Sequence, residues 1–315
     1  MNEVIIVGSK GQDGRLLHNI LNDNKRSIIE IDIDYANSSD SDWVKKVDIS
    51  NFSEVSQFID QVKPSQIYYL AAHHHSSEDQ LGDLNDLLQK SYKVNVFCYL
   101  NFLESIREFS PKTRIFYAAS SHIYGEPEEP LQDELTKFNP KSIYAITKLD
   151  GLLLSRHYRE NYSVFSSVGI LYSHESSLRK DSFVSKKIVK TAIAIKNGLS
   201  NELVIGDINA ELDWGYAGDY VQAMLKILEH EKPDDFIVAS GKKIRLKDFI
   251  ALVFDYLDLD WKNFIKESPE VLTRKNTNLL CGNPRKLMDQ TGWKPTVNLE
   301  QLAKLMVDHE LEQLR

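Results

Sequence analysis

The chain has 315 residues, of which 42% are hydrophobic and 27% are charged, and its formal net charge is -8. This composition is typical of a folded protein with a sizeable core, and the acidic balance argues against nucleic acid as a partner, because phosphate backbones bind basic surfaces. The two cysteines form no metal-type spacing or disulfide framework, and neither a membrane span nor a secretion leader is apparent, so we expect a cytoplasmic protein without a metal.

The first half alternates short apolar runs with helical patterns. Predicted strands lie at residues 4–7, 28–33, 66–70, 114–118 and 164–170. Predicted helices lie between them at 12–23, 52–62, 84–108 and 142–160. Short buried runs separated by helices indicate βαβ units around a parallel sheet that is covered on both faces.

The pattern changes after residue 170. Residues 171–182 are predicted to form a polar loop. Helices are then predicted at 183–197, 217–230, 246–256 and 298–314, and strands at 203–206 and 236–240. We expect an α/β fold with a doubly wound parallel sheet in residues 1–170 and a smaller α+β lobe in residues 171–315. The boundary is soft, since parts of the second half can return to the main sheet.

A glycine-rich turn follows the first predicted strand. Gly8, Gly11 and Gly14 are spaced G-x-x-G-x-x-G and lead into the first predicted helix. Glycine at these places allows a tight turn, a close approach of the backbone to a pyrophosphate, and close packing of helix on strand. The strand–turn–helix context predicts a dinucleotide-binding Rossmann fold rather than a structural turn, with Gln12 and Asp13 beside the ligand at the helix N-terminus.

Acidic residues at the end of the second predicted strand bear on the choice of dinucleotide. An acid there accepts hydrogen bonds from the adenosine ribose and repels a 2′-phosphate, so Asp32, rather than Asp34, and NAD are favoured. Lys10, just before Gly11, favours NADP instead, because a cation there can meet the 2′-phosphate. The choice between NAD and NADP therefore stays open. Asp48 is predicted to contact the adenine amine. The alternative is that Asp48 caps the helix that begins near Phe52. The other predicted contacts with the dinucleotide are Ile49, Leu70, Ala71 and Ala72.

Tyr144 and Lys148 lie in a predicted helix at a spacing that places both side chains on one face. A nearby ammonium lowers the pKa of a phenol, so Tyr144 can take a proton from a substrate hydroxyl as hydride leaves the carbon, while Lys148 holds the nicotinamide ribose. Ser120 follows the fourth predicted strand, where a hydroxyl faces the site in such a sheet. Y-x-x-x-K alone is a weak pattern, and a serine-rich turn is the alternative for Ser120. Together these features predict a hydride-transfer site.

With these residues in view, the chain resembles the extended short-chain dehydrogenase/reductase family, and within it the GDP-mannose 4,6-dehydratases. The resemblance covers nearly the whole chain and rests on segments that include GSKGQDG, SIYAITK, GILYSHESSLR, DWGYAGDYVQAM and GWKP. It implies oxidation of a nucleotide-sugar at C4, loss of water across C5 and C6, and return of the hydride to C6. A GDP-sugar is the favoured substrate. The resemblance also implies a homodimer or homotetramer that pairs through helices 84–108 and 142–160.

The resemblance further implies contacts with the substrate in the loops and the second half. The predicted contacts are His75, Ser173, Glu175, Arg179, Lys187 and Arg274. Ser173 replaces an asparagine of the family, and for the three cations a solvated surface position is the alternative. The three consecutive histidines, His73 to His75, do not indicate a metal, because neighbours in an extended segment point in different directions.

One departure from the family concerns the chemistry itself. The Thr-x-Glu of the family is Ser120 and His122 here. Serine keeps the hydroxyl, and a neutral imidazole with a reference pKa of ~6.5 can act as a base, but it lacks the fixed negative charge of glutamate. The competing hypothesis is therefore a 4-ketoreductase or 4-epimerase that eliminates no water. A third hypothesis, a non-catalytic protein that senses the dinucleotide, is disfavoured by the intact Tyr144 and Lys148.

Overall fold

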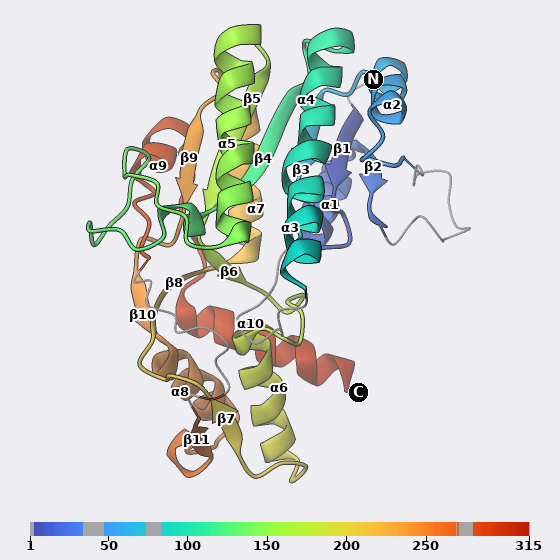
Figure 1. Ribbon diagram of the computed structural model, residues 1–315. Helices are drawn as coiled ribbons and strands as arrows, with labels where there is room; N and C mark the ends of the chain where they lie inside the picture. Colours follow the sequence, from blue (N-terminus) through green and yellow to red (C-terminus); the bar gives the residue numbers. More distant parts are fainter. Residues whose placement is uncertain (1–2, 34–46, 74–82, 269, 271–279, 315) are drawn as a thin grey trace.

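The computed structural model describes residues 3–33, 47–73, 83–268, 270 and 280–314. Figure 1 shows a large sheet with helices along both faces and a smaller lobe beneath it that contains α6, α8 and α10. Each part has its own core of buried apolar side chains. Within the described ranges, no helix is long and apolar enough to cross a membrane.

Six parallel strands form the large sheet in the order β2-β1-β3-β4-β5-β9. Their bounds are β1 Glu3–Val7, β2 Ser27–Ile31, β3 Gln66–Tyr69, β4 Arg114–Ser120, β5 Phe165–Leu171 and β9 Asp235–Val238. The strand order reverses at β1, because β2 pairs with one of its edges and β3 with the other. In open α/β sheets, ligands bind outside the carboxyl ends of the strands at such a reversal.

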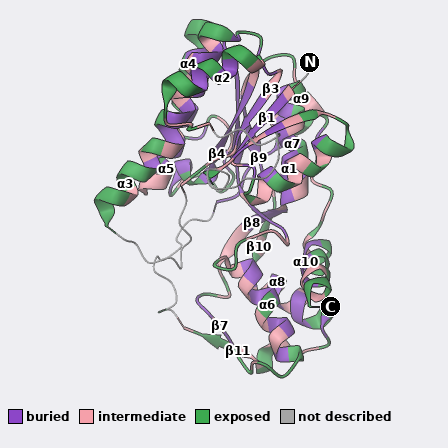
Figure 2. Cartoon of the chain, turned by 90° about the vertical axis from the view of Figure 1, so that its right-hand side faces the viewer, coloured by how far each residue is buried: buried purple, intermediate pink, exposed green. Residues whose placement is uncertain are grey.

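Helices cover both faces of this sheet (Figure 1). One face carries α1 (Gln12–Asp23), α7 (Ala217–Glu229) and α9 (Arg285–Thr291). The other carries α2 (Phe52–Val62), α3 (Leu84–Tyr92), α4 (Cys98–Phe109) and α5 (Ile143–Tyr162). The strands are consequently buried between two layers, as Figure 2 shows, which explains why their sequences are apolar on both faces. The predicted doubly wound α/β sheet is confirmed.

The helix predicted at 84–108 contains an irregular turn. A π-helical segment, η2 (Lys93–Phe97), joins α3 to α4. The apolar pattern runs through this segment without a break, so the sequence gives no sign of the extra residue in the turn. Single π-helical turns occur frequently at functional sites, and this one holds Asn95 in the interior with no exposed surface.

The second half contains short strands that the sequence pattern missed. The predicted loop at 171–182 is wrong in part, because it includes β6 (Ser173–Glu175), which pairs with β8 (Glu211–Tyr216). The remaining elements of the lobe are α6 Val184–Lys196, β7 Leu203–Ile205, β10 Lys243–Arg245, α8 Leu246–Tyr256, η4 Trp261–Asn263, β11 Ile265–Glu267 and α10 Leu299–Gln313. Strands of three residues are too short to display an alternating pattern.

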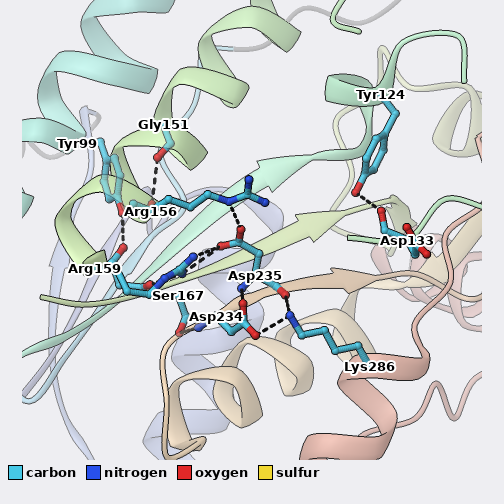
Figure 3. A network of polar contacts seen from close by, with 12 residues as sticks. Tyr99, Tyr124, Asp133, Gly151, Arg156, Arg159, Ser167, Asp234, Asp235 and Lys286 are labelled. Carbon is cyan, nitrogen blue, oxygen red and sulfur yellow. Dashed lines mark hydrogen bonds and ion pairs between the residues drawn. The ribbon is translucent and has the colours of Figure 1, made fainter. Parts of the chain in front are cut away.

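The chain returns to the large sheet through β9. Asp235, which is buried at the start of β9, accepts hydrogen bonds from Arg156 Nε at 2.5 Å and from both terminal nitrogens of Arg159 at 3.1 Å (Figure 3). Both arginines belong to α5. Lys286 of α9 donates to the backbone oxygen of Asp235 at 2.9 Å and pairs with Asp234 at 2.6 Å. Residues on both sides of position 170 therefore build the large part of the molecule.

Candidate active site

The glycine turn lies between β1 and α1, at the point where the strand order reverses. Gly8 has a φ of +91°, and a Cβ there would lie 2.6 Å from the backbone nitrogen of Ala71. A Cβ on Gly14 would lie 2.4 Å from the carbonyl oxygen of Gly8. Gly11 is the N-cap of α1 and has no side chain to occupy the helix N-terminus. The three glycines thus let the backbone of the turn pack closely and leave no side chain at these three positions.

Two further contacts show that the turn fits a dinucleotide phosphate. Ser9 is buried in the turn, and its hydroxyl has no hydrogen-bond partner among the described residues, which leaves capacity for a bound anion. Asp32, the first residue after β2, accepts a hydrogen bond from the backbone N–H of Lys10 at 2.8 Å. This contact ties the end of β2 to the turn and places a carboxylate beside it. Asp34 lies outside the described residues.

The other predicted dinucleotide contacts lie on β3 and before α2. Leu70 N–H donates to the oxygen of Val7 at 2.8 Å, so Leu70, Ala71 and Ala72 follow β3 directly beside the turn. Asp48 is exposed and accepts two hydrogen bonds from Ser50, at 2.9 and 2.7 Å, which lower its pKa. The capping alternative for Asp48 is wrong, because Asn51 caps α2 by accepting from the backbone of Ser53 and Glu54. The carbonyl of Ile49 accepts from Asn101 at 2.9 Å.

The four predicted catalytic residues come together at the carboxyl end of β4 and the first turns of α5. Ser120, the last residue of β4, hydrogen-bonds Tyr144. The ring of His122, in the short helix η3 (Ser121–Tyr124), lies 6.2 Å from the ring of Tyr144. Lys148 Nζ lies 5.8 Å from the Tyr144 ring centroid and donates to the oxygen of Ala118 at 2.8 Å. The structure therefore brings together a hydroxyl, a phenol, an imidazole and an amine.

The electrostatics of this cluster differ from the sequence prediction. Burial raises the pKa of Tyr144 to about 12, against the hydrogen bond with Ser120 and the positive charge of Arg179, which both lower it. Burial also lowers the pKa of Lys148 to about 7. The predicted lowering of the Tyr144 pKa by Lys148 is thus wrong for this structure, because burial is the largest influence on the phenol and Lys148 is not among the groups that shift its pKa. The cation that acts most strongly on Tyr144 is Arg179.

One residue of the site, Asn95 in η2, was missed by the sequence analysis. Its side-chain oxygen accepts from the backbone N–H of His73 after β3 at 2.9 Å, and its side-chain nitrogen donates to Thr147 in α5 at 2.9 Å. Its backbone oxygen accepts from Tyr117 in β4 at 3.0 Å. Asn95 therefore fixes α5, next to Lys148, against the ends of two strands. The sequence carries no local signal of this role, since the partners of Asn95 lie 22 and 52 residues away.

The predicted substrate residues of the second half surround β6. Glu175 is buried, pairs with Arg179 at 3.2 Å, and accepts a hydrogen bond from Ser185 at the start of α6. Arg179 also lies 3.8 Å over the ring of Phe183, and its positive charge lowers the pKa of Tyr144. Ser173 begins β6, and Lys187 is half-buried in α6. His75 and Arg274 lie outside the described residues.

Comparison with known proteins identifies the relatives of this chain. A family model described as GDP-mannose 4,6 dehydratase matches residues 5–306. GDP-mannose 4,6 dehydratase 2 of Arabidopsis thaliana is 34% identical, over 98% of this chain and 86% of that protein. GDP-mannose 4,6-dehydratase of Vibrio cholerae is 28% identical, over 98% of this chain and 93% of that protein.

Solved structures show the same fold at lower identity. RMD from Pseudomonas aeruginosa, complexed with NADPH, has a TM-score of 0.83 at 20% identity and covers 99% of this chain and 100% of its own. dTDP-glucose 4,6-dehydratase from Bacillus anthracis, in complex with NAD, has a TM-score of 0.82 at 16% identity, with 99% and 97% covered. The predicted Rossmann-type fold is confirmed. Since the family model spans nearly the whole sequence and relatives above 30% identity match along most of it, the chain belongs to the GDP-mannose 4,6-dehydratase family of extended short-chain dehydrogenases/reductases.

Proposed function

We propose that this protein is an NAD(P)-dependent enzyme that oxidises a nucleotide-sugar at C4 and eliminates water across C5 and C6, with GDP-mannose as the first substrate to test. The observation that carries the proposal is the cluster of Ser120, Tyr144 and Lys148 beside the glycine turn, in a chain that matches the dehydratase family over residues 5–306. Bound NAD(P) would accept a hydride from the sugar and give it back.

Several residues would hold the dinucleotide. The turn of Gly8, Gly11 and Gly14 and the N-terminus of α1 suit its diphosphate, because the glycines let the backbone approach the ligand and the helix N-terminus offers N–H groups to it. Lys148 is placed to hold the nicotinamide ribose. The carboxylate of Asp32, held beside the turn by Lys10 N–H, favours the ribose hydroxyls of NAD over the 2′-phosphate of NADP.

The side chains then divide the proton transfers. Tyr144 takes the proton of the C4 hydroxyl as hydride leaves C4, and Ser120 hydrogen-bonds the same oxygen. His122, beside Tyr144, takes the proton from C5 and passes it to the C6 hydroxyl, which leaves as water. The hydride returns to C6 and a proton to C5, so the sugar has lost one water and its overall oxidation level is unchanged. Arg179 supports the first step, since its charge favours the Tyr144 phenolate.

A second function, 4-ketoreduction or 4-epimerisation, is favoured by one observation: histidine stands at position 122, where the dehydratases have glutamate. Such an enzyme needs Ser120, Tyr144 and Lys148 but no base for C5. The structures of UDP-glucose 4-epimerases superpose on this chain, with a TM-score of 0.83 for the one from Thermotoga maritima. That likeness supports the shared fold and leaves the choice of reaction to experiment.

Mass spectrometry of the reaction products distinguishes these functions. Pure protein is incubated with GDP-mannose, and separately with UDP- and dTDP-sugars, each without added dinucleotide, with NAD, and with NADH or NADPH. We expect GDP-mannose to lose 18 mass units and to yield a 4-keto-6-deoxy sugar, with Tyr144→Phe as the inactive control. Conversion at constant mass would replace the dehydratase proposal with epimerisation, and product formation that consumes NADH or NADPH would replace it with reduction.

We also propose that the protein pairs with a second copy through α3 and α5, in a cytoplasmic setting. α3 is exposed along most of its length (Figure 2), and apolar side chains on α3, η2 and α5 reach solvent: Leu84, Leu88, Phe97, Ile146 and Leu153. Exposed apolar patches of this kind mark protein interfaces. Light scattering after size exclusion should give at least twice the chain mass, and Leu88→Glu with Leu153→Glu should give the monomer.

We assign the dinucleotide to the large part and the sugar nucleotide to the lobe around β6.

A further inference from the structure

His174 in β6 joins the substrate lobe to the dinucleotide turn through both nitrogens of its ring. Nδ1 lies 2.7 Å from the backbone oxygen of Tyr172. Nε2 lies 3.1 and 3.0 Å from the two carboxylate oxygens of Asp13, in the first turn of α1. A carbonyl and a carboxylate are both acceptors, so each ring nitrogen must carry a hydrogen to bond its partner. Only the imidazolium form of His174 satisfies this geometry.

The neighbouring residue of α1 strengthens the same link. Gln12 donates to the backbone oxygen of His174 at 3.2 Å, and Ser176 donates to the side-chain oxygen of Gln12 at 2.8 Å. The His174 ring also stacks on Tyr220 of α7, with centroids 4.6 Å apart. Side-chain hydrogen bonds therefore connect the first turn of α1 to β6. Asp13 and His174, which make one of these contacts, are 161 residues apart in the sequence.

The charges around His174 alternate in sign. Asp13 faces it from α1, Glu175 adjoins it in β6, and Arg179 follows β6, so two carboxylates balance two cations. Burial is the largest single influence on His174 and lowers its pKa, but the charge of Asp13 and the hydrogen bonds to Asp13 and Tyr172 together raise it above the ordinary value. Burial likewise opposes ionisation of Asp13, yet His174 and Arg179 bring its pKa below the ordinary value. Both shifts favour the charged forms, in agreement with the hydrogen-bond geometry of the ring.

Asp13 matters for the chemistry because it acts on two sites. It lies in the first helical turn after the glycine loop, where an unpaired carboxylate would repel a dinucleotide phosphate. The negative charge of Asp13 also raises the pKa of Tyr144, whereas the positive charge of Arg179 lowers it. Loss of the positive charge on His174 would remove the cation that acts most strongly on Asp13 and leave Arg179 to offset its charge, so the turn would repel the dinucleotide more and Tyr144 would become a weaker acid.

We propose that His174 is a positioning residue that stays charged throughout the catalytic cycle, neutralises Asp13 at the dinucleotide turn, and thereby couples the geometry of the substrate lobe to the acidity of Tyr144. The role in Tyr144 acidity rests on the proposed function. The roles in charge and dinucleotide binding do not, and they can be tested without turnover.

Two substitutions separate the two contacts. In His174→Asn, the amide nitrogen replaces Nδ1 and keeps a donor toward Tyr172, while the bond to Asp13 and the charge are lost. In His174→Gln, the amide nitrogen replaces Nε2 and keeps a donor toward Asp13 without the charge. Asp13→Asn combined with His174→Asn removes both charges and restores local neutrality. His157→Asn, at an exposed position near the far end of α5, is the matched control.

Calorimetric titration with NAD gives the first result. We expect His174→Asn to weaken NAD binding by about tenfold or more, His174→Gln to weaken it less, and the double variant to recover much of the affinity, because charge-assisted hydrogen bonds are the strong ones. The affinity for GDP should change little. Equal losses for NAD and GDP, with no recovery in the double variant, would reduce His174 to a structural role and overturn the proposal.

Nitrogen NMR of the histidine rings tests the charge directly. The His174 signals, identified by their absence in His174→Asn, should show two protonated nitrogens from pH 6 to pH 8, and Asp13→Asn should make the ring neutral by pH 8. A neutral ring in the unmodified protein at pH 8 contradicts the proposal. If turnover is found, the alkaline rise of kcat that reports Tyr144 should move to higher pH in His174→Asn and stay in place in His157→Asn.

Discussion

Replacing Lys148 by methionine is expected to stabilise the protein near neutral pH while it abolishes turnover. Lys148 is 2% exposed, and its ammonium donates a hydrogen bond to the backbone oxygen of Ala118. An ammonium in such a place loses its hydration, which is why burial lowers its pKa to about 7. Methionine has a similar length and no charge, so it fills the same space without that cost.

The magnitude follows from the pKa. A fall from the ordinary value of 10.5 to about 7 corresponds to about 5 kcal/mol at about 1.4 kcal/mol per pH unit. This destabilisation is fully present below pH 7, where the folded state must hold the ammonium, and it vanishes as the pH approaches 10.5. Methionine leaves the Ala118 oxygen without its donor, which costs about 1–3 kcal/mol. The free energy of unfolding of Lys148→Met should therefore exceed that of the unmodified protein by about 2–4 kcal/mol at pH 6. This difference should be smaller by about 2.5 kcal/mol at pH 9.

Urea denaturation at pH 6 and pH 9 measures this difference. Nucleotide-free protein is used, because bound dinucleotide stabilises the folded state of whichever variant binds it. Lys226→Met, at an exposed position of α7, is the control and should change the free energy of unfolding by less than about 0.5 kcal/mol at either pH. A Lys148→Met variant that is less stable than the unmodified protein, by the same amount at both pH values, would refute the account of a desolvated amine.

Three further predictions concern the same site. Tyr144→Phe should lower kcat by about 10²- to 10⁴-fold and leave NAD affinity nearly unchanged, as steady-state kinetics and calorimetry would show; undiminished turnover rules out its acid–base role. Gly14→Ala should destabilise the protein by about 1–3 kcal/mol in urea and weaken NAD binding, because its Cβ meets the backbone of Gly8 and Ser9 within 2.7 Å and would distort the turn; unchanged binding would show that the turn keeps the shape that the ligand needs. Asp32→Asn should shift the ratio of NAD to NADP affinity toward NADP in parallel titrations, and a constant ratio means that Asp32 does not choose the cofactor.

Local patterns determined the parts of this protein that depend on near neighbours in the chain. The bounds of α1 and α2 agree with the prediction to the residue, since each has an apolar stripe and a clear start, at Gly11 and at Asn51. The turn of Gly8, Gly11 and Gly14 was predicted because a strand and a helix flank it within a few residues. Tyr144 and Lys148 were placed on one face because four residues are about one helical turn.

The tertiary structure decided what depends on residues far apart. No local pattern pairs Asp13 with His174 or places Asn95 between β3 and α5, because such contacts leave no periodic trace in the chain. Short strands such as β6 were missed for the same reason, since their partners lie far along the sequence. The direction of the Tyr144 pKa was predicted wrongly, because a spacing of four residues shows that an ammonium is near but not that both groups are buried. Proximity along a helix is a property of the sequence, whereas desolvation is set only when the rest of the fold closes around it.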